Sequence, residues 1–215
     1  MTILENYQKI KDNIKKNYPN KSPNIIAVSK TFDLDYIMPL INHGHEHFGE
    51  NKVQEALKKW SDLKKKNNKI KLHMIGKLQS NKAKDAFKLF DYIHSLAGQK
   101  LALKLKNLEE SSEKKLKYFI QVNLGDEEQK SGVSKKELNE FKNYCISDLG
   151  LDVIGLMCIP PQSNDVALYF SELLKLNLSF GFKHLSMGMT ADYMEALKYE
   201  STYLRVGSAI FGSRG

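Results

Sequence analysis

In the segment IIAVSKTF (residues 25–32), a run of four apolar residues is followed by Ser29 and then by Lys30. A lysine at the end of a buried strand needs a polar partner or a chemical role, because an unpaired charge is costly to bury. Its amine could bind a phosphate, form a salt bridge or, once desolvated, attack a carbonyl carbon. Lys30 is therefore the first candidate for chemistry.

Two motifs rich in glycine and hydroxyl residues lie near the C-terminus: LSMGMT at residues 185–190 and RVGSAIFGSRG at residues 205–215. Glycine lets backbone N–H groups approach a phosphate, and serine or threonine adds a hydroxyl donor. The glycines Gly188, Gly207 and Gly212 could instead only form tight turns. If the fold brings the two motifs together, they predict an anion site.

These residues must be positioned by short β-rich segments that alternate with amphipathic helical segments. Strands are predicted for residues 24–29, 46–50, 71–76, 92–96, 117–123, 152–158, 183–188 and 202–207. Helices are predicted for residues 3–17, 34–43, 53–66, 82–89, 99–110, 135–147, 165–178 and 191–198. Strict alternation of the two predicts parallel strands joined by helical crossovers.

Eight strands and a leading helix predict an α/β fold: one (β/α)8 TIM barrel with an extra N-terminal helix, forming a single domain over residues 1–215. An open doubly wound sheet would show the same alternation, but no G-x-G-x-x-G motif follows the first predicted strand. Barrel enzymes place their sites at the carboxyl ends of the strands, often with a phosphate after strands seven and eight. Lys30, LSMGMT and Arg205 would then share one rim. A carbonyl-reactive lysine, a phosphate site and an arginine together suggest pyridoxal 5′-phosphate (PLP) as the ligand.

The composition indicates a soluble, cytoplasmic protein. The 215 residues are 41% hydrophobic, and they include neither a signal peptide pattern nor an 18-residue apolar run. The two cysteines, Cys145 and Cys158, are expected to be reduced thiols. Cys158, at the end of the sixth predicted strand, could be a reactive thiol, although free cysteine is more often a small core residue.

The formal net charge of +8 invites a nucleic-acid interpretation. Nearly all of this charge is lysine spread along helical segments, however, and the only arginines are Arg205 and Arg214. Base recognition usually draws on the planar fork of arginine. A solvated lysine-rich surface explains the charge better, and no nucleic-acid partner is expected.

A histidine-rich segment, HGHEH at residues 43–47, invites a metal assignment. Gly44 is expected to end the preceding helix, so the histidines His43, His45 and His47 straddle a helix-to-strand junction. Convergence of three ligands on one ion is then improbable, and no metal is predicted.

The sequence resembles the pyridoxal phosphate homeostasis protein family (YggS/PROSC type), which shares the barrel of the N-terminal domain of bacterial alanine racemases. The motifs that carry the resemblance occur in order over nearly the whole chain. They are AVSKTF, HFGENKVQEALKKW, LHMIGKLQSNK, IHSL, FIQVNLGDEEQKSG, GLMCIPP, LSMGMTADYMEA and RVGSAIFGSRG.

The resemblance implies that Lys30 holds PLP as a Schiff base and that Arg205 faces the pyridine nitrogen of the cofactor. It implies phosphate contacts at Ser186, Gly207 and Ser208.

The resemblance further implies that Asn51, His73 and Ser95 line the pocket. Phe32 stands where the family often has a polar or basic residue, which argues against a second, lysine-mediated PLP transfer site near the first strand. Leu72 replaces a frequent tryptophan. Thr190, like Ser208, keeps the hydroxyl of the residue it replaces.

The function implied by the resemblance is intracellular PLP homeostasis: buffering the cofactor or delivering it to PLP-dependent apo-enzymes without strong turnover. An arginine cannot accept a proton from the pyridinium nitrogen, so the cofactor would be a weak electron sink. No second, racemase-type domain is expected after Gly215, which also favours a monomer. The alternative is a fold-type III, PLP-dependent racemase-like enzyme.

Overall fold

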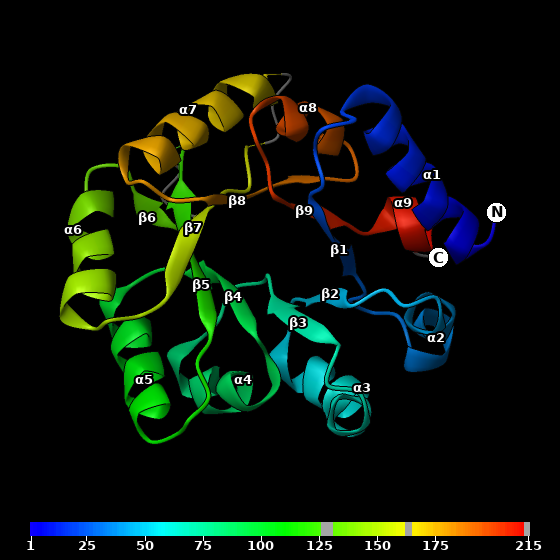
Figure 1. Cartoon of the computed structure of the whole chain (residues 1–215). Helices are drawn as coiled ribbons and strands as arrows, with labels where there is room; N and C mark the ends of the chain where they lie inside the picture. The colour runs from blue at the N-terminus through cyan, green and yellow to red at the C-terminus, as the bar shows by residue number, and fades with distance from the viewer. Residues whose placement is uncertain (126–130, 162–164, 213–215) are drawn as a thin grey trace.

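Parallel strands close into a barrel in the computed structural model, which describes residues 1–125, 131–161 and 165–212 (Figure 1). Neighbouring strands pair in the order β4-β3-β2-β1-β9-β8-β7-β5, and the β4–β5 pairing closes the ring. This closure confirms the predicted (β/α)8 barrel and excludes the open doubly wound sheet. The barrel strands are β1 (Asn24–Val28), β2 (His47–Glu50), β3 (Lys71–Met74), β4 (Tyr92–Leu96), β5 (Lys117–Asn123), β7 (Val153–Met157), β8 (His184–Met189) and β9 (Tyr203–Val206).

Helices surround the ring of strands (Figure 1). The leading helix α1 begins with a capping box, in which the side chains of Thr2 and Glu5 each accept a hydrogen bond from the other residue's backbone N–H. The longer helices are α1 (Ile3–Asn17), α2 (Leu34–Asn42), α3 (Val53–Lys66), α4 (Ala83–Leu89), α5 (Gln99–Glu110), α6 (Leu138–Asn143), α7 (Val166–Ser179) and α8 (Tyr193–Lys198). None of the helices in the described ranges is long and apolar enough to cross a membrane.

Four short elements were not predicted. They are the 3-10 helix η1 (Ser80–Lys82), the two-residue strand β6 (Val133–Ser134) beside β5, the π-helical turn η2 (Tyr144–Asp148) and the helix α9 (Ser208–Phe211). The sequence predicted one regular helix over residues 135–147, whereas α6 begins later and continues directly into η2. An apolar period of 3.6 does not reveal a local change from α to π winding, because both keep one face against the sheet.

The barrel has two distinct apolar regions. A large one lies between the strands and the helices, while the cluster inside the ring consists of Ile26, Phe119, Met157 and Tyr203. Side chains alternate between these regions along each strand. Several other interior positions hold buried polar side chains in place of the branched aliphatic residues typical of such barrels: His73, His94, Ser186 and Arg205.

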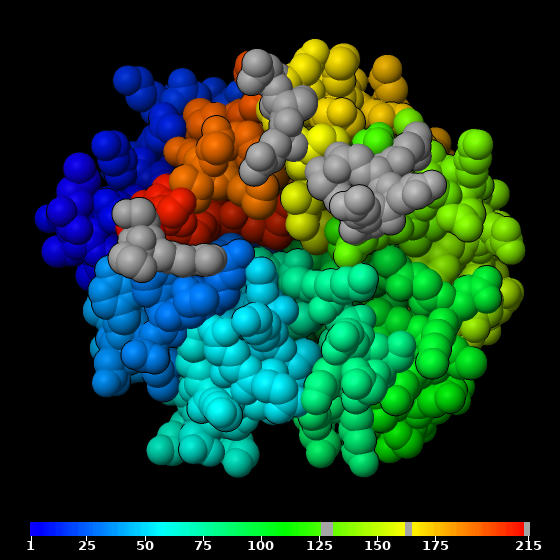
Figure 2. Space-filling view, turned by 180° about the vertical axis from the view of Figure 1, so that it is seen from behind, coloured from blue at the N-terminus to red at the C-terminus, as the bar shows by residue number. Residues whose placement is uncertain are grey.

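One face of the barrel gathers the segments that leave β1, β8 and β9. Figure 2 shows this face, where the blue, orange and red parts of the chain adjoin. Strand β1 pairs with β9 in parallel, with Ile26 opposite Arg205, so the first and last barrel strands end side by side. The predicted neighbourhood of Lys30, LSMGMT and Arg205 follows from this pairing.

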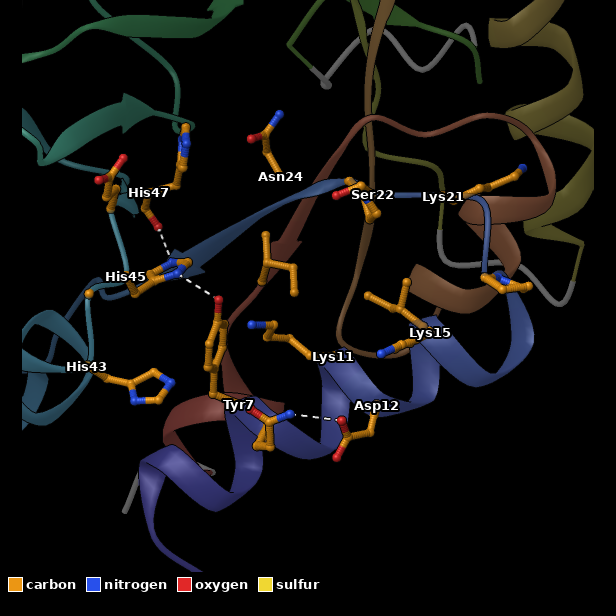
Figure 3. Close-up of a pocket in the computed structure, with 17 residues that line it drawn as sticks. Tyr7, Lys11, Asp12, Lys15, Lys21, Ser22, Asn24, His43, His45 and His47 are labelled. Atoms are coloured by element: carbon orange, nitrogen blue, oxygen red, sulfur yellow. Dashed lines mark hydrogen bonds between the residues drawn. The ribbon is translucent and has the colours of Figure 1, made fainter.

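On the other side of the barrel, hydrogen bonds of His45 connect α1 to the start of β2 (Figure 3). The ring Nε2 of His45 lies 2.8 Å from the carbonyl oxygen of His47, so Nε2 carries the proton and donates it. Nδ1 therefore accepts from the Tyr7 hydroxyl on α1 at 3.0 Å. His45 is buried, and burial lowers its pKa to about 4.

Acid should destabilise the fold through the buried histidines His45, His73 and His94, whose pKa values are all lowered chiefly by burial. The unfolded chain takes up protons as the pH falls through about 6.5, whereas the folded chain keeps these rings neutral. Stability present above pH 6.5 is therefore lost on acidification, and for His45 the loss ends near pH 4. Urea unfolding at pH 7 and pH 5 would measure this loss.

His45→Gln isolates one contribution, because glutamine can replace both hydrogen bonds but cannot titrate. We expect its stability to fall less steeply with acidification than that of the unaltered chain, by up to about 1.4 kcal/mol per pH unit. His43→Gln, which removes an exposed histidine, should change the slope less than His45→Gln does. Equal slopes for the unaltered chain and His45→Gln would contradict the assignment.

Candidate functional site

A cavity of about 460 Å³ opens at the carboxyl ends of β1, β8 and β9. Its size suits a small-molecule ligand. Apolar side chains form much of the wall, and a few polar groups converge on it from different loops. The polar lining consists of Lys30, Asn51, Thr190, Arg205 and Ser208, with the backbone of Gly207 and Gly212.

A buried hydrogen-bonded cluster behind the end of β1 holds the backbone that leads to Lys30. We call this cluster of Ser29, Glu50, Lys59 and Trp60 the Lys59 clamp. Lys59 on α3 donates to the carbonyl oxygen of Ser29 at 2.8 Å and to Oε1 of Glu50 at 2.9 Å. The same carboxylate oxygen accepts from the Ser29 hydroxyl at 2.8 Å and from Nε1 of Trp60 at 2.9 Å. The residue directly before Lys30 is therefore held through its carbonyl and its side chain.

The residue after Lys30 is held as well. Thr31 has a φ of 71°, a left-handed conformation that β-branched residues rarely adopt. Its N–H donates to Oε1 of Glu55 at 2.6 Å, and Glu55 lies 3.6 Å from Lys59. The strained turn at Thr31 and the Lys59 clamp together fix the backbone on both sides of Lys30.

Arg205 brings a buried positive charge to the cavity, and its side chain is 4% exposed. Its Nη1 donates to the Ser186 hydroxyl at 2.7 Å, and its Nη2 donates to the carbonyl oxygen of Cys158 at 2.8 Å. No carboxylate in the described part of the chain forms an ion pair with it. Burial lowers the pKa of Arg205, and the guanidinium nevertheless remains charged.

Thr190 links the two glycine motifs at the edge of the cavity. Its Oγ1 accepts from the backbone N–H of Gly207 and of Ala209, each at 3.3 Å. Gly188, with a φ of 91°, allows this loop to pass close to α8, because a Cβ there would lie 2.6 Å from that of Ala196. These bonds occupy both backbone N–H groups, so the donors that this corner offers to the cavity are the hydroxyls of Thr190 and Ser208, which suit a phosphate.

The structure brings most of the sequence-predicted site residues together. Lys30, Asn51, Arg205, Gly207 and Ser208 all line the same cavity.

The structure does not bring Ser186, His73 or Ser95 to the cavity wall. Ser186 and His73 are fully buried on strands that point them into the barrel, where their polar atoms bond to other side chains. Ser95 donates to the carbonyl oxygen of Gly76 and lines a different cavity, beside Lys77 and Gln121. Ser186 acts on the cavity through Arg205, and the hydroxyl of that motif at the cavity wall belongs to Thr190.

Sequence reasoning missed the residues behind the wall. Glu50 and Lys59 stand outside the ring and do not touch the cavity, so neither glycine pattern nor rim position identifies them. The available signal was a charged residue, Glu50, inside an otherwise buried segment, which requires a partner. Lys59 lies on the next helix, where one lysine among several carries no distinguishing mark.

Two further sequence candidates have structural explanations. Cys158 is buried, and burial raises the pKa of its thiol to about 12, so it is an unreactive core residue whose carbonyl serves Arg205. The histidines His43, His45 and His47 line one cavity, but the ring nitrogens of His45 and His47 bond to other groups, and no group of three potential metal ligands occurs within the described ranges.

Lys59→Met should destabilise the protein by about 3 kcal/mol, because it leaves the buried Glu50 carboxylate without its cation. Oε2 of Glu50 already has no partner among the described atoms, so the charge depends on Oε1. Chemical denaturation measures the change. The matched control Lys58→Met alters an exposed neighbour and should change stability by less than about 0.5 kcal/mol.

A Glu50→Gln/Lys59→Met double variant should recover part of the loss, since it removes both charges. If Lys59→Met were as stable as Lys58→Met, the clamp would have no energetic role.

Comparison with known proteins places the chain in a family. Residues 2–215 match the family described as "Alanine racemase, N-terminal domain". A pyridoxal phosphate homeostasis protein of Pasteurella multocida (strain Pm70) is 34% identical over 100% of this chain and 98% of its own length. That of Escherichia coli (strain K12) is 33% identical over 88% of this chain and 85% of its own.

Solved structures agree with the sequence matches. PipY of Synechococcus elongatus PCC7942, solved with PLP bound, superposes with a TM-score of 0.83 at 29% identity, covering 98% of this chain and 100% of PipY. Alanine racemase from Corynebacterium glutamicum shares the fold, with a TM-score of 0.64 at 17% identity over 89% of this chain and 56% of the racemase. The chain belongs to the pyridoxal phosphate homeostasis protein family, whose barrel is the one described for the alanine racemase N-terminal domain.

Proposed function

We propose that this protein binds PLP in the cavity at the carboxyl ends of the strands and serves intracellular PLP homeostasis, as a buffer or carrier of the cofactor. Residues 1–215 would act as one PLP-binding domain. The names of its curated relatives and the PLP-bound structure of PipY support this function.

The residues lining the cavity fit the chemistry of PLP. The cofactor supplies an aldehyde that condenses with a primary amine and releases its carbonyl oxygen as water. Lys30 offers that amine, on a backbone held by the Lys59 clamp. The hydroxyls of Thr190 and Ser208, beside the backbone of Gly207, offer donors for the phosphate, and Arg205 offers N–H donors to a ring nitrogen that is not protonated.

A carrier role, in preference to racemisation, rests on one observation. Of the described residues that line the cavity, only Lys30 and Arg205 have ionisable side chains. A two-base racemase needs two groups that exchange protons on opposite faces of the substrate, and arginine does not exchange its proton at neutral pH. Lys30 alone would leave one face without an acid or base.

Lys30→Ala should abolish covalent attachment of PLP. We expect the purified protein to take up PLP with a visible absorption band, and borohydride reduction to leave a pyridoxyl group on the peptide that contains Lys30. The variant should lose both signals because no other lysine lines this cavity among the described residues. The control Lys77→Ala removes an exposed lysine that follows β3 and should retain both.

A colourless protein that takes up no added PLP would overturn the proposal. Racemisation and transamination should also be assayed over a panel of amino acids. Lys30-dependent turnover at ordinary enzymatic rates, about 1 to 1000 per second, would favour the racemase-like alternative.

We further propose that the carrier is a cytoplasmic monomer that releases PLP to apo-enzymes. Both Lys30 and Ser208 are accessible at the cavity mouth, so a bound cofactor could be reached from that face. Sedimentation velocity would test the monomer. Transfer of PLP to an apo-enzyme in the same solution, compared with transfer across a dialysis membrane, would separate delivery by contact from release into solution.

A further inference from the structure

A continuous row of hydrogen-bonded side chains crosses the interior of the barrel from Arg205 to His47. It runs through β9, β8, β4, β3 and β2, which contribute one side chain each. The distances are 2.7 Å from Nη1 of Arg205 to Oγ of Ser186, 2.8 Å on to Nδ1 of His94, 2.9 Å from Nε2 of His94 to Nδ1 of His73, and 2.9 Å from Nε2 of His73 to Nδ1 of His47.

The two ends of this row face different cavities. Arg205 lines the candidate PLP site, while His47 lies at the opposite end of the strands, in a cavity of about 690 Å³ beneath α1 (Figure 3). The three central members, Ser186, His94 and His73, are fully buried. Only the His47 end is partly accessible to solvent.

Arg205 dictates the direction of every hydrogen bond in the row. A guanidinium has donors and no acceptor, so Arg205 donates to Ser186. Ser186 has one hydroxyl proton, and its other partner is Nδ1 of His94, so that nitrogen must accept. His94 then carries its proton on Nε2 and donates to His73, which by the same reasoning donates from its Nε2 to His47. Each of the four bonds thus has one proton, and all three imidazoles are neutral Nε2–H tautomers.

We propose that Ser186, His94, His73 and His47 form a one-way hydrogen-bond relay whose members are positioning residues for Arg205. The relay keeps the Ser186 hydroxyl turned away from Arg205, so that its lone pair always accepts from Nη1. The carbonyl of Cys158 fixes Nη2, and these two contacts set the plane of the guanidinium that faces the cavity. The effect of the Arg205 orientation on PLP binding rests on the proposed function, whereas the tautomers expected for the histidines are independent of it.

Aromatic rings of the described residues pack around the histidines of the relay. Tyr92 stacks on His73 at 4.3 Å between ring centroids, and Phe119 stacks on His94 at 4.4 Å. Tyr203 packs against His47, His73 and His94.

The charged groups that act on the relay also oppose extra protons. Burial is the main factor that disfavours a charge on His94 or His73, and the positive charges of Arg205 near His94 and of Lys64 near His73 add to it. Around His47 the charges are mixed, since Glu46 and Asp91 oppose Lys71. A charged His94 would also force Ser186 to accept two hydrogen bonds and leave its own proton without a partner.

The direct test is the tautomeric state of the histidines in the protein without PLP, measured by ¹⁵N–¹H correlation spectra of the imidazole rings. We expect His94 and His73 each to carry one proton, on Nε2. A proton on Nδ1 of either ring, or on both nitrogens at pH 7, would overturn the relay whether or not PLP binds.

Ser186→Ala tests the positioning role. Without the Ser186 hydroxyl, His94 should be able to carry its proton on either ring nitrogen. PLP binding should weaken roughly tenfold, which corresponds to the loss of one hydrogen bond to a charged group. It should also shift the visible band, because Arg205 is no longer fixed. The control Ser201→Ala removes another buried hydroxyl, which bonds only to backbone carbonyls, and should change neither readout. An unchanged band and affinity in Ser186→Ala would overturn the positioning role.

A second pair of variants acts at the accessible end of the relay, where folding is least at risk. His47→Leu removes the last acceptor. His73 should keep its Nε2–H form, because its Nδ1 still accepts from His94, but the Nε2–H signal should lose the downfield ¹H shift of a hydrogen-bonded proton. His47→Asn supplies an acceptor near the position of Nδ1 and should restore that shift. If His47→Leu left the Nε2–H shift of His73 unchanged, or moved the proton to Nδ1, the proposal would fail. If the wild-type protein bound no PLP, the tautomer results would still stand and only the proposed function would fall.

Discussion

The parallel pairing of β1 with β9 is the constraint on which the candidate site depends. It joins the first barrel strand to the last and sets Ile26 opposite Arg205, so that Lys30 at the end of β1 reaches the cavity lined by Arg205. All strands of a parallel barrel end on one rim, and closure therefore collects residues that are distant in sequence. Without this pairing, the lysine and the glycine motifs would remain separate surface features.

Behind that rim the protein uses buried polar chemistry where similar barrels use aliphatic packing. The Lys59 clamp holds the backbone beside Lys30, and the row of histidines stands behind Arg205. Both arrangements form only in the closed fold, because each joins side chains from different elements. Each is also costly to leave half-formed, so the geometry of the cavity and the stability of the barrel depend on the same contacts.

Most of the architecture was predictable from the sequence, since apolar runs such as residues 25–28 and the 3.6-residue period of 53–66 leave few alternatives. The cavity residues Lys30 and Arg205 followed from rim position. How far along its strand each residue lies, and so whether it reaches the cavity or stays inside the barrel, did not follow from the sequence. Strand β8 runs on to Met189 and pairs with β9 through a register shift, which leaves Ser186 inside the barrel and brings Thr190 to the wall. Irregular register of this kind leaves no periodic signal, and neither does the partner of a buried charge on another helix.

The fixed direction of the hydrogen bonds between His47 and Arg205 has a consequence for the two cavities at the ends of the barrel. Protons can hop along a row of imidazoles only if the last member can receive one, and a guanidinium has no lone pair to do so. The row therefore conducts nothing into the cavity at the rim. A proton taken up at the cavity beneath α1 is therefore not passed on through Arg205 to the cavity that Lys30 lines.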